Sequence, residues 1–294
     1  MNPLSRRIQS YIMSNMALKQ YMQDHDYPSE IAGLILAIGC ELIEWTLICH
    51  HPDGVIFMVE NDLFVWGRCT IPSMGSVYPC RSPDRIVNDK RRELVLTDME
   101  RVKRTYACRS TLRNNNIVLS GIFDGGISLC EMSVPNVKRI FLGHHTAFVL
   151  THSGDVYGCG RNDFYQLGHQ VCMPQKSLVK INVPNGSKIV KIACGVFHTL
   201  FLTEMGTIYA CGSNGCGQLG TGIARELRES SCNEGKPLNI ELSHVIDICC
   251  GGDHSMSITS DGHIHAWGSN YAGQLGVGDT INRTTPELVT FPEF

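Results

Sequence analysis

IACGVFHTLFLTEMGTIYACGSNGCGQLG runs from Ile192 to Gly220, and ICCGGDHSMSITSDGHIHAWGSNYAGQLG repeats it from Ile248 to Gly276. A weaker copy, IFLGHHTAFVLTHSGDVYGCGRNDFYQLG, spans Ile140 to Gly168. The copies follow one another at steps of 52 and 56 residues, counted on the turn glycines Gly154, Gly206 and Gly262. A period of this size indicates stacked supersecondary units, each of which needs its neighbours to bury its apolar faces.

Each copy predicts a small antiparallel sheet. Thr199–Thr203 is a short apolar run, Gly206 supplies the positive φ that a hairpin turn needs, and Thr207–Cys211 runs back. Lys188–Cys194 precedes them with apolar residues between lysines, and Ser213–Gly220 follows as a glycine-rich loop. Sheets repeated at this spacing predict the blades of a β-propeller.

We count five such units, anchored on the glycines Gly67, Gly121, Gly160, Gly212 and Gly268. The sequence therefore predicts an all-β fold over residues 41–294, a β-propeller of about five four-stranded blades. Pro286–Phe291 resembles Pro237–Leu242, a strand that we expect to open a unit and that the first unit lacks. We expect this C-terminal strand to complete the first blade and close the ring. The alternative is an extra strand from Ile31–Ile38 and a ring that is open or differently closed.

Residues 1–40 predict a helical extension of the propeller. Apolar side chains share one broad face of the segment 4–22, namely Leu4, Ile8, Tyr11, Ile12, Leu18 and Tyr21. This helix either packs against the propeller or binds a partner or a second copy, and the oligomeric state stays open. The apolar run Ile31–Cys40 is too short for a bilayer, which takes about 20 residues, so we expect no membrane association.

Composition favours a soluble protein of the cytoplasm or the nucleus. The chain of 294 residues carries a net charge of −3 and 18% charged residues, which is too weak a field to hold nucleic acid by charge alone. Its 14 cysteines form no CxxC pair and follow no secretory signal, which indicates a reducing compartment. The basic residues between Arg81 and Arg104 alternate with acidic ones and predict a solvated face; the alternative is an acidic partner or the DNA phosphates of chromatin.

We expect no catalytic, cofactor or metal site, and so no enzyme. Gly215–Gly220 matches GxGxxG, but it follows a hairpin and opens no helix, whereas a dinucleotide site needs both a strand and a helix. The His-His pairs at 50–51 and 144–145 fall in a repeated column, which explains them without a metal. No carboxylate pair or nucleophile–histidine arrangement stands out beyond the repeat columns.

The repeat resembles the regulator of chromosome condensation family. The pattern CGxxHTxxLTxxGxxYxCGxNxxGQLG carries the resemblance, which is strongest over residues 140–276. Blades of the WD type would show a Trp-Asp pair, and kelch blades lack the Gly-Gln-Leu-Gly ending. The resemblance implies a propeller, in its familiar form of seven blades, that binds proteins; one member of the family exchanges nucleotide on a Ran-type small GTPase.

The resemblance also implies candidate partner-binding residues in the Gly-x-x-His column. Acidic and histidine residues of this column face the GTPase in the exchange factor. The matching residues here are Asp253, His254, His198, Phe197 and, in a segment shifted by one, His145. The other interpretation is that each histidine hydrogen-bonds its own blade, whereas Asp253 does not repeat. We expect this column on the opposite rim from the Gly-Gln-Leu-Gly end, or near the central channel.

Two functions are consistent with these residues. The first is a protein-interaction propeller without chemistry of its own, which binds a protein partner through rim loops such as 68–92 and 213–236. The alternative is a guanine-nucleotide exchange factor for a Ran-like or other small GTPase. An exchange factor stabilises the nucleotide-free GTPase by differential binding and needs no catalytic acid or base, so a search for catalytic residues does not separate the two.

Overall fold

The computed structural model describes the chain in two degrees of detail. It describes residues 137–224 and 236–290 with their side chains, apart from the side chain of Asn185. Before them it describes the backbone of strands within 45–51, 54–59, 62–67, 70–71, 75–76, 80–85, 109–113, 116–122 and 127–132. The predicted helical extension over residues 1–40 lies outside the described residues.

Three four-stranded antiparallel sheets follow one another in the C-terminal half, each with its strands in chain order. The first holds β10 (Val137–Leu142), β11 (Thr146–Thr151), β12 (Val156–Gly160) and β13 (Gln175–Ile181). The second holds β14 (Ile189–Cys194), β15 (His198–Thr203), β16 (Ile208–Gly212) and β17 (Leu238–Asn239). The third holds β18 (Val245–Cys250), β19 (His254–Thr259), β20 (Ile264–Gly268) and β21 (Arg283–Leu288).

Two further blade-like sheets and a two-stranded ribbon precede them. The first sheet pairs β1 (Trp45–His51), β2 (Gly54–Val59), β3 (Asp62–Gly67) and β6 (Cys80–Arg85). The ribbon pairs β4 (Thr70–Ile71) with β5 (Gly75–Ser76). The other sheet holds β7 (Arg109–Arg113), β8 (Asn116–Ile122) and β9 (Ile127–Met132). The only helix among the described residues is one 3-10 turn, Pro184–Gly186, and none of them is long and apolar enough to cross a membrane.

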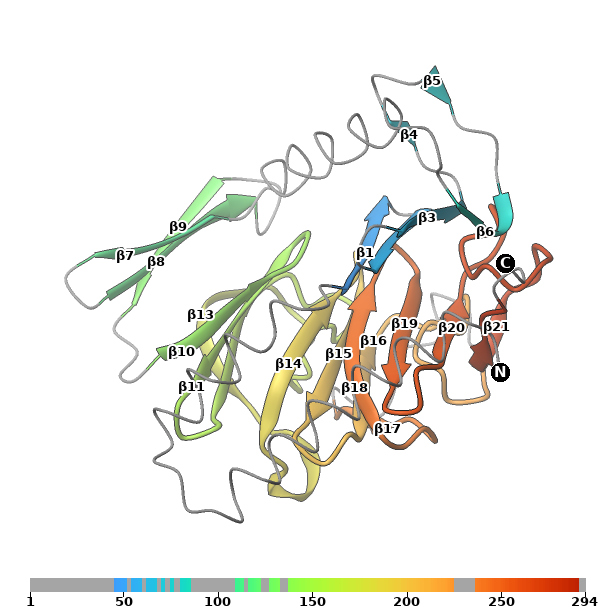
Figure 1. Ribbon diagram of the computed structural model, residues 1–294. Helices are drawn as coiled ribbons and strands as arrows, with labels where there is room; N and C mark the ends of the chain where they lie inside the picture. The colour runs from blue at the N-terminus through green and yellow to red at the C-terminus, as the bar shows by residue number, and fades with distance from the viewer. Residues whose placement is uncertain are drawn as a thin grey trace, which may run out of the picture.

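The sheets are arranged as the blades of a propeller (Figure 1). The first strands of neighbouring sheets lie against each other, β10 against β14 and β14 against β18, so these strands are the inner edge of the arrangement. β1 lies against β18, which makes the first and last sheets neighbours although their strands are far apart in the sequence. The all-β, propeller-like fold of four-stranded antiparallel sheets is thereby confirmed.

The C-terminal strand completes its own sheet, so the expectation that it completes the first blade is wrong. β21 pairs with β20, and the first sheet already has a fourth strand, β6. The segment Pro237–Leu242 likewise contributes β17 as the last strand of a sheet, and it does not open one. The physical reason is local: the chain returns to the open edge of the sheet that it has just left, and a short loop costs less closure entropy than a long one.

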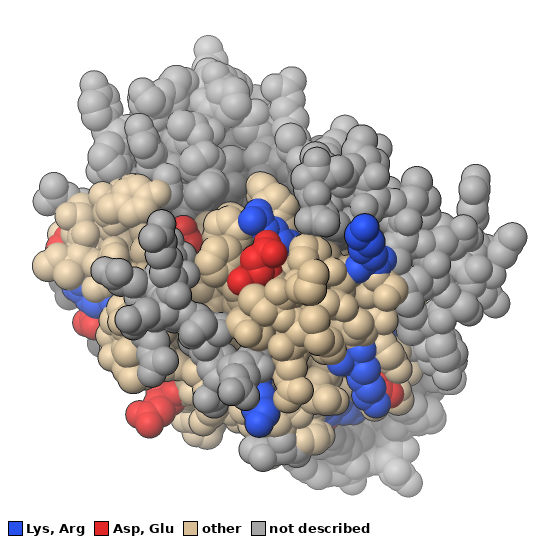
Figure 2. Space-filling model, turned by 180° about the vertical axis from the view of Figure 1, so that it is seen from behind, with Lys and Arg blue, Asp and Glu red and all other residues tan. Residues whose placement is uncertain are grey.

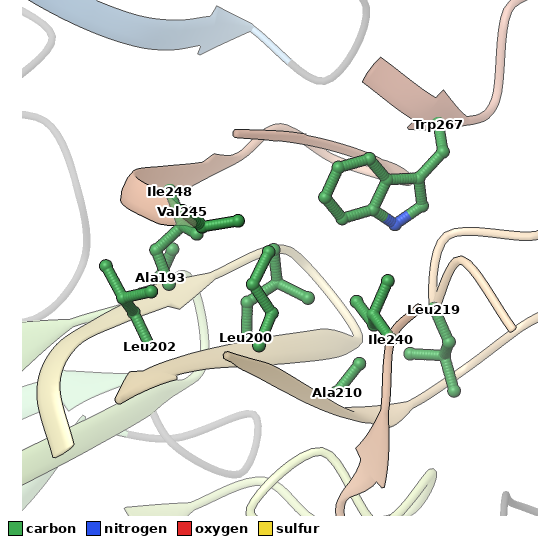
Figure 3. Close-up of a cluster of buried hydrophobic side chains, with 10 residues drawn as sticks. Ala193, Leu200, Leu202, Ala210, Leu219, Ile240, Val245, Ile248 and Trp267 are labelled. Carbon is green, nitrogen blue, oxygen red and sulfur yellow. The ribbon is translucent and has the colours of Figure 1, made fainter. Parts of the chain in front are cut away.

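Apolar clusters between the sheets form the core. The cluster between β14–β17 and β18–β21 contains Leu200, Leu219, Ile248 and Trp267 (Figure 3), all fully buried. The cluster on the other side of β14–β17 contains Phe148 and Phe201, whose rings meet edge to face at 5.7 Å, together with the buried Cys211. Cys211 and Trp267 occupy the same position of their sheets, which confirms that this column of cysteine and tryptophan serves core packing.

Candidate partner-binding rim

The Gly-x-x-His segments and the Gly-Gln-Leu-Gly loops lie on the same rim of the sheets. Ser213 N donates to Phe197 O at 2.8 Å, and Ser269 N donates to Asp253 O at 2.8 Å. Each contact joins the start of a Gly-Gln-Leu-Gly loop to the Gly-x-x-His segment of the same sheet. The expectation of opposite rims is therefore wrong, whereas the position at the end of the inner strands agrees with the alternative near the central channel. We call this end of the sheets the motif rim.

The repeated residues of the Gly-Gln-Leu-Gly loops form hydrogen bonds that hold the loop and the next sheet in place. Asn214 Oδ1 accepts from Leu219 N at 3.1 Å, and Gln218 Oε1 accepts from Cys216 N at 2.9 Å. The main-chain oxygen of Gln218 then reaches the next sheet, where it accepts from Ser255 Oγ at 2.8 Å and from Trp267 Nε1 at 3.0 Å. The same internal bonds recur in the other two loops, with Asn162, Gln166, Asn270 and Gln274. The motif therefore folds its own loop and fastens one sheet to the next.

The two histidines of the column are buried. His198 is 1% exposed and His254 is 0% exposed, and each begins the second strand of its sheet. His198 Nε2 lies 2.9 Å from Ser255 Oγ of the next sheet. Burial, and secondly His254, lower the pKa of His198 to about 3, so its ring is neutral at physiological pH. Thr146, 3% exposed, holds the corresponding position in the first repeat.

The position just before these buried residues faces outward. It is occupied by His145 before β11, by Phe197 before β15 and by Asp253 before β19, and all three residues are half-buried. His145 thus aligns with Phe197 and Asp253, and the interpretation that placed it in the column of His198 is corrected. Gln218 Nε2 donates to Asp253 Oδ1 at 3.2 Å, which holds the carboxylate against the preceding loop.

A cluster of aromatic and cationic side chains surrounds Phe197. The ring of Phe164 lies 5.0 Å from that of Phe197, and the ring of His145 is stacked at 6.3 Å with an interplanar angle of 25°. The guanidinium of Arg161 lies 5.4 Å from the centre of the Phe197 ring and also pairs with Asp163. We call Phe164, Phe197, His145 and Arg161 the Phe197 cluster.

Sequence reasoning missed Phe164 and Arg161. The signal that could have found them is the departure of their loop from the repeat. Arg161 stands where the other copies have Ser213 and Ser269, and Phe164 stands where they have Cys216 and Ala272.

Charges on the rest of the surface are mixed. On the face that Figure 2 shows, lysines and arginines lie singly or beside acidic residues, and neither sign gathers into a patch among the coloured residues. Within residues 137–224 and 236–290, no group of three or more histidine, cysteine or acidic side chains could hold a metal ion. Burial, and secondly Asp253, raise the pKa of the Cys216 thiol, which keeps it protonated.

The sequence matches one family of repeats. Residues 153–202, 205–258 and 261–294 match the model of the regulator of chromosome condensation (RCC1) repeat, and a second model of this repeat matches 189–218 and 245–274. Residues 153–294 consist of RCC1 repeats. The match covers β12 and β13 of the first of the three best-described sheets and all strands of the next two.

Curated relatives match about half of the chain. The probable E3 ubiquitin-protein ligase HERC3 of Homo sapiens is 34% identical over 154 residues, which are 52% of this chain and 14% of HERC3. The ultraviolet-B receptor UVR8 of Arabidopsis thaliana is 33% identical over 158 residues, which are 53% of this chain and 35% of UVR8. The chain thus spans a minor part of the length of the relatives that it matches.

A solved structure supports the fold. Prp20p of Saccharomyces cerevisiae, described together with its binding to Gsp1p and histones, superimposes with a TM-score of 0.53 at 15% identity. The superposition covers 87% of this chain and 65% of Prp20p. At this identity the likeness concerns the RCC1 propeller fold alone.

The relatives contradict the expectation that the protein is not an enzyme. HERC3 and HERC4 of Homo sapiens are described as probable E3 ubiquitin-protein ligases, and the matches cover 14% and 15% of their lengths. RCC1 repeats therefore occur within proteins described as enzymes. A lack of catalytic motifs in the repeats does not classify the protein that carries them, and we withdraw the expectation.

Proposed function

We propose that this protein binds a protein partner through its motif rim, with the Phe197 cluster at the centre of the contact and Asp253 beside it. The observation that carries this proposal is the contrast between repeated and non-repeated residues on one rim. The repeated Asn, Gln and His residues are occupied by bonds within and between the sheets. The residues that vary between repeats stand outward on this fixed frame, where binding residues are expected.

The chemistry of the Phe197 cluster suits a protein contact. Aromatic residues and arginine are enriched at the energetic centres of interfaces, where well-packed rings exclude water. Phe197 is held by neighbours on several sides before any partner arrives, so little conformational entropy is lost on binding. His198 and His254 contribute indirectly, because they fix the segments that present Phe197 and Asp253.

Phe197→Ala should weaken partner binding and leave the fold intact. The partner is first trapped by a photoreactive p-benzoylphenylalanine at position 197, with the same group at Met205 as the control. Met205 is 80% exposed and lies in the β15–β16 turn, at the other end of the sheet. With the purified partner, loss of an aromatic interface centre is expected to cost about 2–4 kcal/mol, or roughly 30- to 1,000-fold in affinity. Equal trapping from both positions, or unchanged affinity of Phe197→Ala, would refute the proposal.

Exchange of guanine nucleotide on a Ran-like small GTPase is the second candidate. Asp253 favours it, because this carboxylate matches the family's Gly-x-x-His column, does not repeat, and is held on the rim by Gln218. Purified protein is mixed with small GTPases loaded with fluorescent nucleotide, and Asp253→Ala serves as the matched variant. Accelerated release that Asp253→Ala slows would favour this candidate; binding without release would leave the interaction function alone. Chromatin as a partner and a nuclear or cytoplasmic location stay predictions.

The rim rests on a ring that we propose to be closed and five-bladed. A closed ring of five sheets has five junctions between neighbouring sheets. Four of them occur among the described strands, through β9 with β13, β10 with β14, β14 with β18, and β18 with β1. The fifth would join the first sheet to β7–β9, across residues 86–108.

A further inference from the structure

One buried side-chain amide beside the Phe197 cluster has no hydrogen-bond acceptor. Gln166 is 1% exposed, and its Oε1 accepts from Phe164 N at 2.9 Å, which fixes the orientation of the amide. Within the described part of the chain, its Nε2 is buried and has no hydrogen-bond partner. A buried N–H donor without an acceptor is unfavourable, and it points to a group that the free protein does not supply.

The other two loops satisfy the same donor within the protein. Gln218 Nε2 donates to Ser213 Oγ at 3.4 Å and to Asp253 Oδ1 at 3.2 Å. Gln274 Nε2 donates to Ser269 Oγ at 3.2 Å. An acceptor for this amide is therefore a regular part of the repeat.

The first loop has lost both of these acceptors. Arg161 stands where the other two loops have serine, and Phe197 stands where the next sheet has Asp253. A guanidinium carries N–H donors and no acceptor, and a phenyl ring has no lone pair. By the same equivalence, the side chains of Arg161 and Phe197 begin beside Gln166 Nε2.

Arg161 brings further N–H donors to this place. Among the residues described with side chains, its guanidinium hydrogen-bonds through Nε alone, to Asp163. Both side chains of this pair are 38% exposed, and such an exposed ion pair is weak, so the guanidinium is free to turn toward a second anion. The acidic side chains on this part of the rim, Asp163 and Asp253, already have donors in Arg161 and Gln218. The site therefore has more donors than acceptors.

We propose that the partner places the carboxylate of an aspartate or glutamate at the Phe197 cluster, where it accepts from Arg161 and from Gln166 Nε2. This inference rests on the proposed function and adds the chemistry of the partner. Arg161 makes the first contact, and the carboxylate reaches the buried Nε2 when the side chains of Arg161 and Phe197 move apart. A carboxylate is favoured over a neutral acceptor because it forms paired, charge-assisted bonds with a guanidinium.

The free protein tests whether the acceptor is missing. NMR compares the side-chain amide protons of Gln166 with those of Gln218 and Gln274. We expect the Gln166 resonances upfield of the other two, and a downfield shift in Arg161→Ser, which restores the serine of the other loops. Wild-type Gln166 resonances that already match those of Gln218 would overturn the proposal, because a bound water or another group would then satisfy the amide.

The partner trapped at position 197 tests the carboxylate. Sequencing of its cross-linked peptide identifies nearby acidic residues, and each is changed to the corresponding amide. One of these changes should lower the affinity about 10- to 100-fold, the range for a hydrogen bond to a charged group, and Arg161→Ser should cause a similar loss. Together they should cost little more than either alone, because both remove the same contact. Losses that add, or binding that depends on a phosphate group of the partner, would contradict the proposal.

Asp163→Asn is the matched variant of opposite sign. It removes the competing carboxylate from Arg161, so the affinity for the partner should rise about two- to fivefold. Glu204→Gln is the control, because it removes an exposed ion pair with Lys188 at the opposite end of the sheet and should leave the affinity unchanged. A lower affinity of Asp163→Asn would show that the partner brings no acid to this place.

The same measurements separate this inference from the proposed function. If Phe197→Ala binds as well as the wild type, the proposed function fails. If Phe197→Ala binds weakly but neither Arg161→Ser nor any of the partner's amide changes alters the affinity, only the inference of a carboxylate fails.

Discussion

Tyr165 has a left-handed backbone conformation, and the other two repeats have glycine at this position. Its φ is 58°, and the corresponding residues of the next two repeats are Gly217 at 85° and Gly273 at 77°. A left-handed conformation costs a residue with a Cβ roughly 1–2 kcal/mol. The first loop therefore carries backbone strain next to Phe164 and Arg161, the two residues by which it departs from the repeat.

Tyr165→Gly is expected to stabilise the protein. Relief of the left-handed strain outweighs the greater chain entropy of glycine, for a net gain of about 0.5–1 kcal/mol in the free energy of unfolding. Denaturant unfolding measures it. Gly217→Ala is the opposite control, because an added Cβ would lie 2.7 Å from Arg283 O. A lower stability of Tyr165→Gly would show that packing of the phenol ring exceeds the strain.

At the scale of the element, neighbouring strands compensate for each other's volume. The small Cys211 of β16 pairs with Thr199 of β15 and shares its sheet face and apolar cluster with the large Phe201, two residues further along β15. The large Trp267 of β20 pairs with Ser255 of β19 and shares its sheet face with the small Ser257, two residues further along β19. Cys211 and Trp267 also approach equivalent oxygens, those of Gln166 and Gln218. The two blade junctions therefore reach similar packing with different residues.

Trp267→Cys should be costly although the repeat itself contains cysteine at that position. The lost volume and the lost Nε1 bond to Gln218 O are expected to cost about 3–5 kcal/mol, the range for a large-to-small change in a core. Addition of Ser257→Phe should recover part of this, so that the double variant is more stable than Trp267→Cys alone. Melting temperatures of the three variants test it, and a double variant less stable than either single one would reject the compensation.

At the scale of the whole molecule, each sheet depends on its two neighbours. β14–β17 packs between β10–β13 and β18–β21 through the two apolar clusters. β18–β21 packs on β14–β17 at one side, and at the other its inner strand lies against β1. Closure of the ring therefore decides whether the backbone amides of the last sheet are shielded from solvent as well as those of the middle sheet.

Hydrogen exchange of the backbone amides tests whether the ring is closed. In a closed ring the amides of β19 should exchange about as slowly as those of β15, because both strands are fully buried between two neighbouring sheets. In an open ring β19 would exchange much faster, since the last sheet would open locally without the rest. The outer strand β21 is an internal reference, because none of its residues is buried and its amides should exchange quickly in both cases.

Local sequence features predicted much of the fold and part of the candidate rim. The period, the turn glycines and the alternation of apolar residues act over a few residues, and they predicted the strands, the hairpins and the packing role of the Cys211–Trp267 column. The same short-range information predicted which segments carry candidate binding residues, since His145, Phe197 and Asp253 all precede the second strand of a sheet.

Contacts between distant segments decided the rest. Which sheet accepts β21 depends on the free edge beside it, and sequence similarity to Pro237–Leu242 carried no information about that edge. Which residue of the Gly-x-x-His segment is buried depends on the neighbouring sheet, because Ser255 of that sheet bonds to the His198 ring. Phe164 meets Phe197 only because one loop crosses to the next sheet. The sequence alone determined the blades, and the packing of one blade on the next determined which side chains remain for a partner.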